Sequence, residues 1–432
     1  MEQEAILSTM TGDTILVGDT RQLDSPSFSK SLSLRYGSDN SYNKSRREEG
    51  RHPYPVHLGM AVFTPDKAMI YDSIVIGCGP AGSTALRTMA KAGLQVLGLE
   101  KQAIGRYKPC AGAISGACQD LLDLDLGHLI CHEITSVELR YDHKRFIREW
   151  KQPVASLVMR DEFDAFLANQ AKIAGATILE DTPATSLEQH HDSVIVHTNK
   201  GAFTAKSVIA ADGCQGISRR LLKLPKSTWG ISIHSEIPMI EEYRHPAHRP
   251  IVWFAKPQGG YAWCFPKRDY LSCGAGTTNP KYRSQVRKSF DDFLTMLGIQ
   301  TGQSKLWAHQ LADGTERVPL VHGRLLLTGD AGSLADPLSG EGILHAIYSG
   351  QQAGLAAVRA VENNDFTFPH YQKQIDQSAK KILNSAGTLA KLIHWKPRLT
   401  FGLCTRFPFL FDYYFSIIAG ERTHPGCQLL SS

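Results

Sequence analysis

The sequence lacks several features that would place it in a specialised class of protein. Its 432 residues contain no uncharged apolar run of about eighteen residues, the length that a membrane-spanning helix requires. We find no internal repeat, no low-complexity tract and no nucleic-acid-binding motif. With 42% hydrophobic residues, 21% charged residues and a net charge of +5, the composition is typical of a soluble globular protein. This weak positive charge fits a membrane surface or a phosphorylated substrate, but an ordinary solvated surface explains it equally well.

The cysteines also lack a pattern that would indicate disulfides or a metal site. There are nine of them, an odd number, and no two are spaced as CxxC. We therefore expect free thiols in a reducing compartment and no metal centre. Glu2 and Glu4 argue against a transit peptide, and the missing apolar segment argues against a signal peptide. These features predict a cytoplasmic protein and leave peripheral contact with a membrane open.

Residues 1–68 differ in composition from the rest of the chain. They are rich in Ser, Asp, Arg and Asn and hold few large apolar residues, which predicts a disordered or loosely attached leader. Met69 stands just before the first predicted strand, so one hypothesis is that translation starts at Met60 or Met69. The remaining length is too great for one typical core, and we expect two interleaved domains or one large domain with insertions.

The strongest pattern lies in residues 71–101. A β-branched run at 73–76 predicts a strand, residues 83–92 predict a helix, and 95–99 predict a second strand. Three glycines between the first strand and the helix have GxGxxG spacing, and Glu100 follows the second strand where a dinucleotide fold places its ribose-binding carboxylate. The stretch alone leaves FAD and NAD equally open.

Each glycine of this pattern has a steric reason. Gly77 permits the tight turn, Gly79 lets the backbone approach a pyrophosphate, and Gly82 lets helix and strand pack closely. Pro80 and Ala81 lie between the second and third glycines, and the N-terminus of the predicted helix offers unpaired N–H groups to the phosphate charge.

The rest of the chain alternates between two kinds of pattern. Strands at 176–179, 193–197, 207–210 and 325–327 are apolar enough for a buried nucleotide-binding sheet, whereas 134–158 and 230–320 are rich in alternating strands. A helix that begins near 158, capped by Asp161, is expected after the first of these strand-rich segments. A long helix is expected over 343–361, and the chain after it reads as helical.

Further motifs occur in a characteristic order. Arg160 and Asp164 form an RxxFD arrangement, Asp212-Gly213 follows, and Gly329-Asp330 precedes the long helix. This order resembles FAD enzymes of the glutathione-reductase-like, p-hydroxybenzoate-hydroxylase type. The resemblance implies that Asp330 binds a ribityl or ribose hydroxyl, that Arg160 lies beside the dinucleotide, and that Asp212-Gly213 supports the chain near both. It also implies that the helix after Gly340–Gly342 points its N-terminus at the flavin ring.

A more specific resemblance, to the geranylgeranyl reductase family, covers residues from about 70 to 425. It rests on Lys108-Pro-Cys-Ala-Gly112, on Gly260-Tyr-Ala-Trp-Cys-Phe-Pro-Lys267 and on the segment from Gly329 to Gly342. Phe411-Asp412 and Gly420-Glu421 also look like the family's tail. The chain departs from the family's usual pattern at Ala111, where glycine is common, and at Gly332, where alanine is usual.

The resemblance implies a complete domain plan. We expect an α/β protein in which a Rossmann-like FAD-binding domain is interleaved with an antiparallel-sheet substrate domain and followed by a helical C-terminal region. The FAD-binding domain would comprise 69–132, 159–225 and 321–362, the substrate domain 133–158 and 226–320, and the helical region 363–432.

It also implies a set of site residues. The expected catalytic residues are Cys110, Tyr261 and Trp263. The expected FAD contacts are Gly77, Gly79, Pro80, Ala81, Gly82, Glu100, Lys101, Cys110, Ala111, Arg160, Asp212, Gly213, Gly329, Asp330, Gly340, Glu341, Gly342 and Ile343.

Alternatives remain open for several of these residues. Tyr261, Trp263 and Phe265 alternate along a predicted strand, so they share one face, which is either a substrate tunnel or the core side of the sheet. Cys110 serves as proton donor, as a positioning group or as a buried structural thiol. His309 and His345 fall in no recognised motif and are expected to be structural.

The implied activity is the reduction of carbon–carbon double bonds in a prenyl chain by hydride transfer from reduced FAD. The electron donor would be NAD(P)H or a ferredoxin, and no second dinucleotide fingerprint is present. Two alternatives are an FAD monooxygenase or halogenase acting on a small apolar or aromatic molecule, and a flavin-binding protein without turnover. Residues 395–418 combine Lys396, Arg398 and Arg406 with many apolar side chains, which suits a membrane interface and core packing equally.

Overall fold

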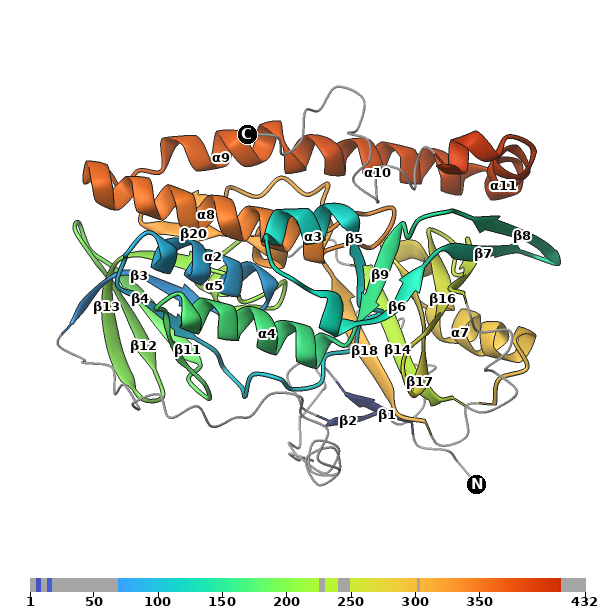
Figure 1. Ribbon diagram of the computed structural model, residues 1–432, viewed down its shortest axis with the longest axis horizontal. Coiled ribbons are helices and arrows are strands. Elements are labelled where there is room, and N and C mark those ends of the chain that lie inside the picture. Colours follow the sequence, from blue (N-terminus) through green and yellow to red (C-terminus); the bar gives the residue numbers. More distant parts are fainter. Residues whose placement is uncertain are drawn as a thin grey trace.

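A parallel-centred β-sheet and a mostly antiparallel β-sheet stand side by side in the computed structural model, and helices lie across both (Figure 1). The structure describes residues 5–8, 14–17, 69–224, 230–239, 249–300 and 304–412. The expected leader lies outside the described residues, except for β1 (Ala5–Ser8) and β2 (Thr14–Val17). The hypothesised start at Met60 and the tail residues Gly420-Glu421 also lie outside them.

The first sheet has a parallel centre, as the apolar strands predict. Within the described residues its eight strands are β10 (Thr177–Leu179), β4 (Val96–Leu99), β3 (Ile70–Ile76), β13 (Gly201–Ala210), β12 (Val194–Thr198) and β11 (Ala184–Gln189), with β19 (Val321–His322) and β20 (Leu325–Leu327) attached beside β13. β4, β3, β13 and β20 run parallel, and their carboxyl ends meet at one edge of the sheet. The predicted α/β fold class is thereby confirmed.

Helices cover this sheet. α2 (Pro80–Lys91) follows the glycine turn with proline in its first turn, where a missing N–H costs nothing. α8 (Ile343–Asn363) packs against α2, and the two can approach closely because a side chain at Gly350 would overlap the backbone of Ala81. α4 (Arg160–Ile173) also packs against α2.

The expected cap of α4 was wrong. Its N-cap is Met159, and Asp161 lies inside the first turn, because the helix begins two residues earlier than a cap at Asp161 requires. At this position the carboxylate of Asp161 still interacts favourably with the positive end of the helix dipole.

The second sheet is mostly antiparallel, and a hydrophobic core packs against one of its faces. Its nine strands among the described residues are, in order, β2, β1, β18 (Leu306–Leu311), β14 (Gly230–Pro238), β17 (Tyr270–Thr277), β16 (Gly260–Pro266), β15 (Ile251–Phe254), β7 (Ser136–Tyr141) and β8 (Lys144–Glu149). α7 (Gln285–Met296) packs Phe290 and Phe293 against one face, together with Ala262 and Cys264 of β16. Tyr261, Trp263 and Phe265 alternate with these two residues and point to the opposite face.

A small third sheet joins the two halves. It consists of β5 (Ala113–Ser115), β9 (Ala155–Val158) and β6 (Ile130–Ile134), and α3 (Gly116–Leu122) follows β5. The expected boundary at 132–133 therefore falls inside β6, because short strands from both expected domains pair here.

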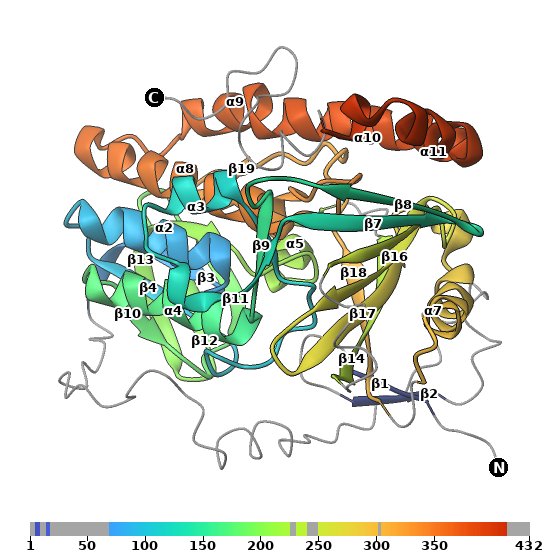
Figure 2. The ribbon, with the colours of Figure 1, turned by 45° about the vertical axis from the view of Figure 1, so that its right-hand side comes forward.

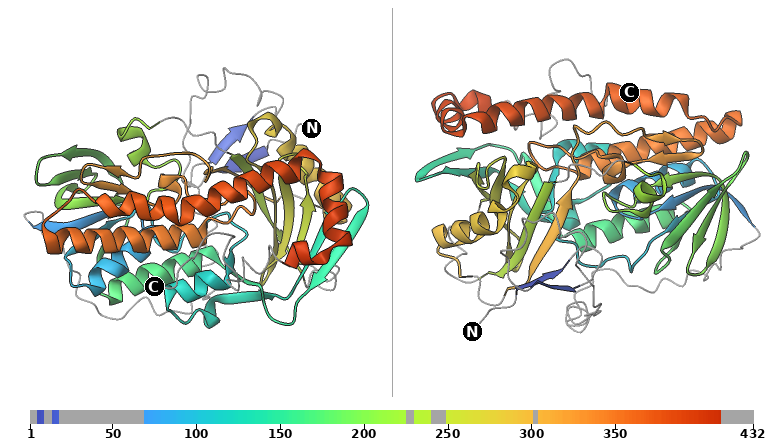
Figure 3. Two further views of the ribbon diagram at one scale, coloured as in Figure 1. Left: turned by 90° about the horizontal axis from the view of Figure 1, so that it is seen from above. Right: turned by 180° about the vertical axis from the view of Figure 1, so that it is seen from behind.

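After α8, within the described residues, three labelled helices lie along one side of both sheets (Figures 2 and 3). They are α9 (Pro369–Gln377), α10 (Ala379–Trp395) and α11 (Pro397–Arg406). None of the helices within the described ranges is both long enough and apolar enough to cross a bilayer.

Candidate active site

A cavity of about 550 Å³ lies between the carboxyl edge of the parallel strands and the open face of the antiparallel sheet. In α/β folds this edge is where ligands bind. The predicted site residues that line the cavity are Gly77, Gly79, Pro80, Ala81, Glu100, Lys101, Cys110, Ala111, Arg160, Asp212, Gly213, Tyr261, Trp263, Asp330, Gly340, Gly342 and Ile343. The structure therefore brings segments more than 250 residues apart into one site.

Three predicted residues do not line this cavity. Gly82 packs its Cα against the carbonyl oxygen of Gly77, and a side chain there would overlap that oxygen. Gly329 has a φ of +58° and donates its N–H to Ser349 Oγ at 2.9 Å. Glu341 lies beside Ser115, and burial raises the pKa of its carboxyl to about 7. These residues hold the backbone of the site in place without facing it.

The glycine turn is fixed by backbone contacts. Gly77 has a φ of +92°, a region that strongly favours glycine, and a Cβ there would lie 2.6 Å from the carbonyl oxygen of Ala211. The nearest atom to a Cβ at Gly79 is Lys108 Nζ at 3.8 Å, so the backbone at Gly79 is open to the cavity. Glu100 Oε2 accepts a hydrogen bond from Cys78 N at 2.9 Å, which ties the acid to the turn.

Arg160, Lys108 and Asp164 form a buried ionic cluster at the cavity wall. Arg160 Nε donates to Asp164 Oδ1 at 2.9 Å and its Nη2 donates to Oδ2 at 3.1 Å. Lys108 Nζ donates to the same carboxylate. Burial alone would raise the pKa of Asp164, but these two cations outweigh it and hold that pKa well below its usual range. The cluster thus presents a net positive charge beside the glycine turn.

Two carboxylates face the cavity with unused hydrogen-bonding capacity. Asp212 Oδ2 accepts from Ser218 N at 2.9 Å, while its buried Oδ1 has no partner among the described residues. Burial raises the pKa of Asp330, and we find no hydrogen bond to its carboxylate in the described part of the chain. Ligand hydroxyl groups would satisfy both acceptors, so these residues fit the ribose and ribityl chains of FAD.

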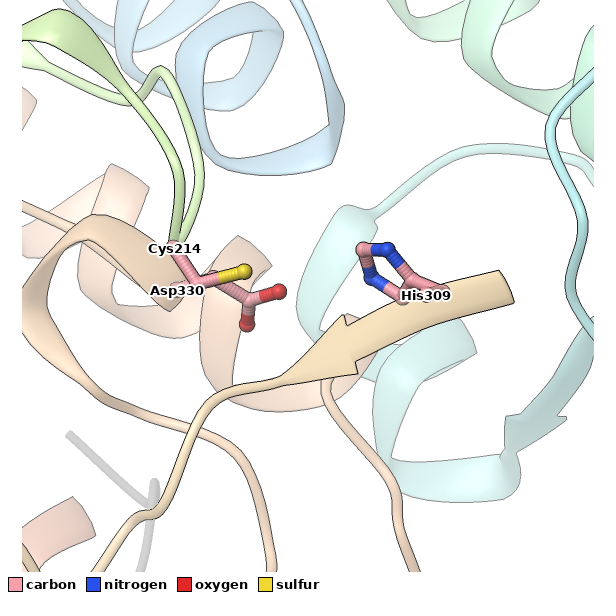
Figure 4. Close-up of side chains that lie close together, drawn as sticks. All are labelled: Cys214, His309 and Asp330. Atoms are coloured by element: carbon pink, nitrogen blue, oxygen red, sulfur yellow. The ribbon is translucent and has the colours of Figure 1, made fainter. Parts of the chain in front are cut away.

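Cys214 and Asp330 lie side by side and point toward His309, which is carried by β18 (Figure 4). One side-chain atom from each of the three lies within 4.8 Å of the others, a spacing that could hold a metal ion. However, burial raises the pKa of the Cys214 thiol to about 12, and Cys214 Sγ donates to the carbonyl oxygen of Gln310 at 3.3 Å. A protonated thiol is a poor metal ligand, and all three residues line the cavity described above.

The open face of the antiparallel sheet carries two rows of side chains across four strands. Strand register places Tyr261, Gly276, Ser232 and His309 in one row, and Trp263, Gly274, His234 and Trp307 in the next. Within the second row the ring centroids of His234 lie 6.4 Å from Trp263 and 6.1 Å from Trp307. The two glycines on β17 leave room for the larger neighbours, so the rows form an aromatic wall of the cavity.

His234 is an unusual member of this wall. It is only 3% exposed, and neither ring nitrogen has a hydrogen-bond partner among the described residues. Burial, followed by the charge of Lys267, lowers its pKa to about 3, so the ring is neutral. No motif in the sequence pointed to this residue, although strand alternation at the start of the strand-rich segment 230–320 places Ser232 and His234 on one face.

Tyr261 links this wall to the segment before α8. Its hydroxyl donates to the carbonyl oxygen of Ser339 at 2.5 Å. His309, which the sequence analysis expected to be structural, also lines the cavity, whereas His345 is buried within α8.

Cys110 faces the cavity from the loop that connects the two halves. Its sulfur accepts from Gly112 N at 3.3 Å and lies within hydrogen-bonding reach of Arg160. The thiol therefore sits beside the ionic cluster, at the point where the parallel and antiparallel sheets approach each other.

Comparisons with known proteins agree with this site. The family model for an FAD-binding domain matches residues 71–354. A digeranylgeranylglycerophospholipid reductase from Thermoplasma volcanium is 30% identical over 320 residues, which covers 69% of this chain and 80% of the relative. The chain belongs to the geranylgeranyl reductase family.

Two further members of this family extend the comparison. A geranylgeranyl diphosphate reductase from Rhodobacter capsulatus is 30% identical and covers 67% of this chain and 75% of its own. The crystal structure of a geranylgeranyl bacteriochlorophyll reductase-like protein from Thermoplasma acidophilum, 26% identical, covers 75% of this chain and 88% of its own with a TM-score of 0.66. This member of the geranylgeranyl reductase family is therefore an FAD-dependent oxidoreductase.

Proposed function

We propose that this oxidoreductase saturates carbon–carbon double bonds in the prenyl chain of an apolar substrate. The observation that supports this best is the continuity of one cavity from the glycine turn to the aromatic wall of β14 and β16. Family members named as geranylgeranyl and digeranylgeranyl reductases support the same reaction.

An isolated alkene has no carbonyl group through which an acid could polarise it, so the protein contributes mainly by positioning. Bound FAD in its reduced form supplies the hydride. Glu100, Asp212 and Asp330 hold the cofactor, and the N-terminus of α8 at Gly342 favours negative charge there. Trp263 and His234 form an uncharged surface along which an isoprenoid chain can lie, and they keep water from the reacting carbons.

The hydrogen bond from Tyr261 to Ser339 fixes the aromatic wall relative to α8. Because the hydroxyl bridges the antiparallel sheet and the segment before α8, it sets the distance between substrate and cofactor. We therefore assign Tyr261 to positioning and Trp263 to substrate contact.

Cys110 is the proton donor that we propose to test. Cys110 lines the cavity where both halves of the site meet, within hydrogen-bonding reach of Arg160. His234 does not serve as the acid. With a pKa of about 3 its ring is a neutral imidazole at neutral pH, and the acidic imidazolium form is absent. If Cys110→Ser retains full turnover, proton donation by this thiol is excluded and its role is positional.

The test of the function uses the whole protein. Purified protein saturated with FAD is reduced with dithionite, which bypasses the natural electron donor, and then incubated anaerobically with geranylgeranyl diphosphate. We expect products heavier by one hydrogen molecule for each saturated bond, with reoxidation of the flavin. If the substrate stays unsaturated under these conditions, and the flavin is reoxidised with an oxygenated or halogenated product only after oxygen is admitted, the protein is instead a monooxygenase or halogenase.

A further inference from the structure

The outer face of the C-terminal helices carries an exposed apolar patch. Among the described residues, eight of the twelve exposed large hydrophobic side chains lie here: Leu389, Leu392, Trp395, Leu399, Leu403, Phe407, Phe409 and Leu410. Trp395 is 72% exposed and Phe409 is 64% exposed. We call these eight residues the α10–α11 patch. Apolar side chains concentrated in this way on one surface mark an interaction site.

The patch begins abruptly along α10. Over the first half of this helix the exposed positions are polar, with Asn384, Ser385 and Thr388 facing away from the core. From Leu389 onward Leu392 and Trp395 are exposed as well, whereas the buried side of the helix is formed by Ile382, Leu383, Ala386 and Ala390. The apolar surface is therefore additional to the face that packs the helix on the protein.

The charges around the patch are of one sign. Lys391, Lys396, Arg398 and Arg406 are all exposed, and none has a carboxylate partner within the described residues. No aspartate or glutamate occurs in the sequence between Ala379 and Phe411. Lys396 Nζ lies 4.5 Å from the centroid of the Trp395 ring, so the charge and the largest apolar side chain are presented together.

The inner side of the same helices closes the cavity. His394 lines the cavity and stacks on Phe254 of β15 with ring centroids 5.6 Å apart. Phe401 of α11 stacks on Tyr141 of β7, also at 5.6 Å. Farther along, Asp412 accepts two hydrogen bonds of 2.5 Å from Arg148 of β8. α10 and α11 thus lie as a layer over both sheets, as the view from above shows (Figure 3), and His394 brings this layer to the cavity.

We propose that the α10–α11 patch docks on a lipid bilayer with anionic head groups. Leucine, phenylalanine and tryptophan bordered by lysine and arginine form the composition that inserts into a membrane interface. Basic residues favour anionic lipid by about 1 kcal/mol each near the surface. Four exposed basic side chains with no acidic residue between Ala379 and Phe411 favour an anionic lipid surface as the partner.

Docking in this orientation places the cavity wall formed by His394 next to the membrane. If the proposed function holds, a prenyl lipid can then pass from the bilayer to the site without crossing water. This delivery step rests on the proposed function, whereas the docking itself does not.

The test is flotation of the full-length, FAD-loaded protein with vesicles. We expect it to float with phosphatidylglycerol vesicles and to bind phosphatidylcholine vesicles roughly tenfold less tightly or weaker. The triple variant Leu392→Ser, Trp395→Ser, Leu399→Ser should lose at least about tenfold in partitioning while its flavin content stays unchanged. Ile173→Ser, which replaces a 62% exposed isoleucine on α4, is the matched control and should bind like the parent.

Other occupants of the patch would give different results. If the full chain binds neither kind of vesicle, the proposal is wrong, and the patch is covered by another part of the chain. A dimer in solution that the triple variant converts to a monomer, with vesicle binding unaltered, would identify a second copy as the occupant. Saturation of soluble geranylgeranyl diphosphate, assayed separately, tests the reaction alone, so the two proposals fail independently.

Discussion

The indole ring of Trp263 lies over the backbone of Gly274 on the neighbouring strand, in the space that a side chain at Gly274 would fill. A Cβ at Gly274 would overlap the ring carbons and would also lie 2.6 Å from the carbonyl oxygen of Ile233. The bare backbone of β17 at Gly274 therefore leaves the space that the Trp263 ring occupies at the cavity wall.

We accordingly expect Gly274→Ala to push the Trp263 ring into the cavity. Overpacking of this kind costs about 1–3 kcal/mol of folding free energy, and a displaced wall should lower turnover of a geranylgeranyl substrate by roughly tenfold or more. Flavin content should stay near that of the parent, because Gly274 does not line the cofactor end. Gly402→Ala is the control, since no atom lies within 4 Å of the added methyl. Equal turnover in both variants would show that this face does not hold the substrate.

The parallel half of the fold was predictable from the sequence because its signals are local. The turn at Gly77, the strand before it and Glu100 after the next strand fall in a short segment whose spacing follows from the geometry of one βαβ unit. The motif resemblance then placed Asp330 and Tyr261 in one site, and both line the cavity.

The missed residues depend on contacts across strands. His234 and Gly274 enter the site because β14 and β17 pair in one particular register, and no local pattern specifies that register. Glu341 was expected to contact FAD, but the direction of a side chain in a loop depends on neighbours such as Ser115, which are distant in sequence. The third sheet was missed because its strands are only three to five residues long.

The ionic cluster at Asp164 gives a second prediction. Asp164→Asn would leave Arg160 and Lys108 buried together without a counter-charge, which should cost about 3–5 kcal/mol of stability and weaken FAD binding. Since the pKa of Asp164 is depressed in the folded protein, its contribution is present above the unfolded value of 3.8 and is lost as the pH falls below that value. Urea unfolding and flavin fluorescence titration measure the two effects.

A matched control for this change lies on α7. Arg287 and Asp291 form the same i,i+4 pair, but their side chains are 42% and 47% exposed. Asp291→Asn should therefore change stability by less than about 1 kcal/mol. If both variants lose the same amount, burial of the Asp164 cluster has no energetic significance.

Asp330 should show opposite effects on stability and on cofactor binding. Burial removes this carboxylate from water in the FAD-free protein and so raises its pKa. The free energy of unfolding therefore falls as the pH rises and the carboxyl group ionises. Asp330→Ala should therefore raise the unfolding temperature of the FAD-free protein at neutral pH while lowering FAD affinity by about tenfold or more. Asp330→Asn, which keeps a hydrogen-bonding group, should recover part of the affinity. A variant that destabilises the FAD-free protein would show that the carboxylate has a structural role.

Glu341 should make the stability of the protein depend on pH in a defined range. Burial raises its pKa from 4.5 to about 7 in the folded state. Between these two values the unfolded chain releases this proton more readily, so stability falls as the pH rises from 4.5 to 7, by at most about 3 kcal/mol. Glu341→Gln removes this contribution, and urea unfolding of the FAD-saturated variant at pH 5 and pH 8 should show a smaller loss than the parent. Glu362→Gln, at an exposed position of α8, should leave the loss unchanged. The same slope in all three proteins would mean that Glu341 ionises in the folded state as readily as it does in water, and that Ser115 and the surrounding loop leave it solvated.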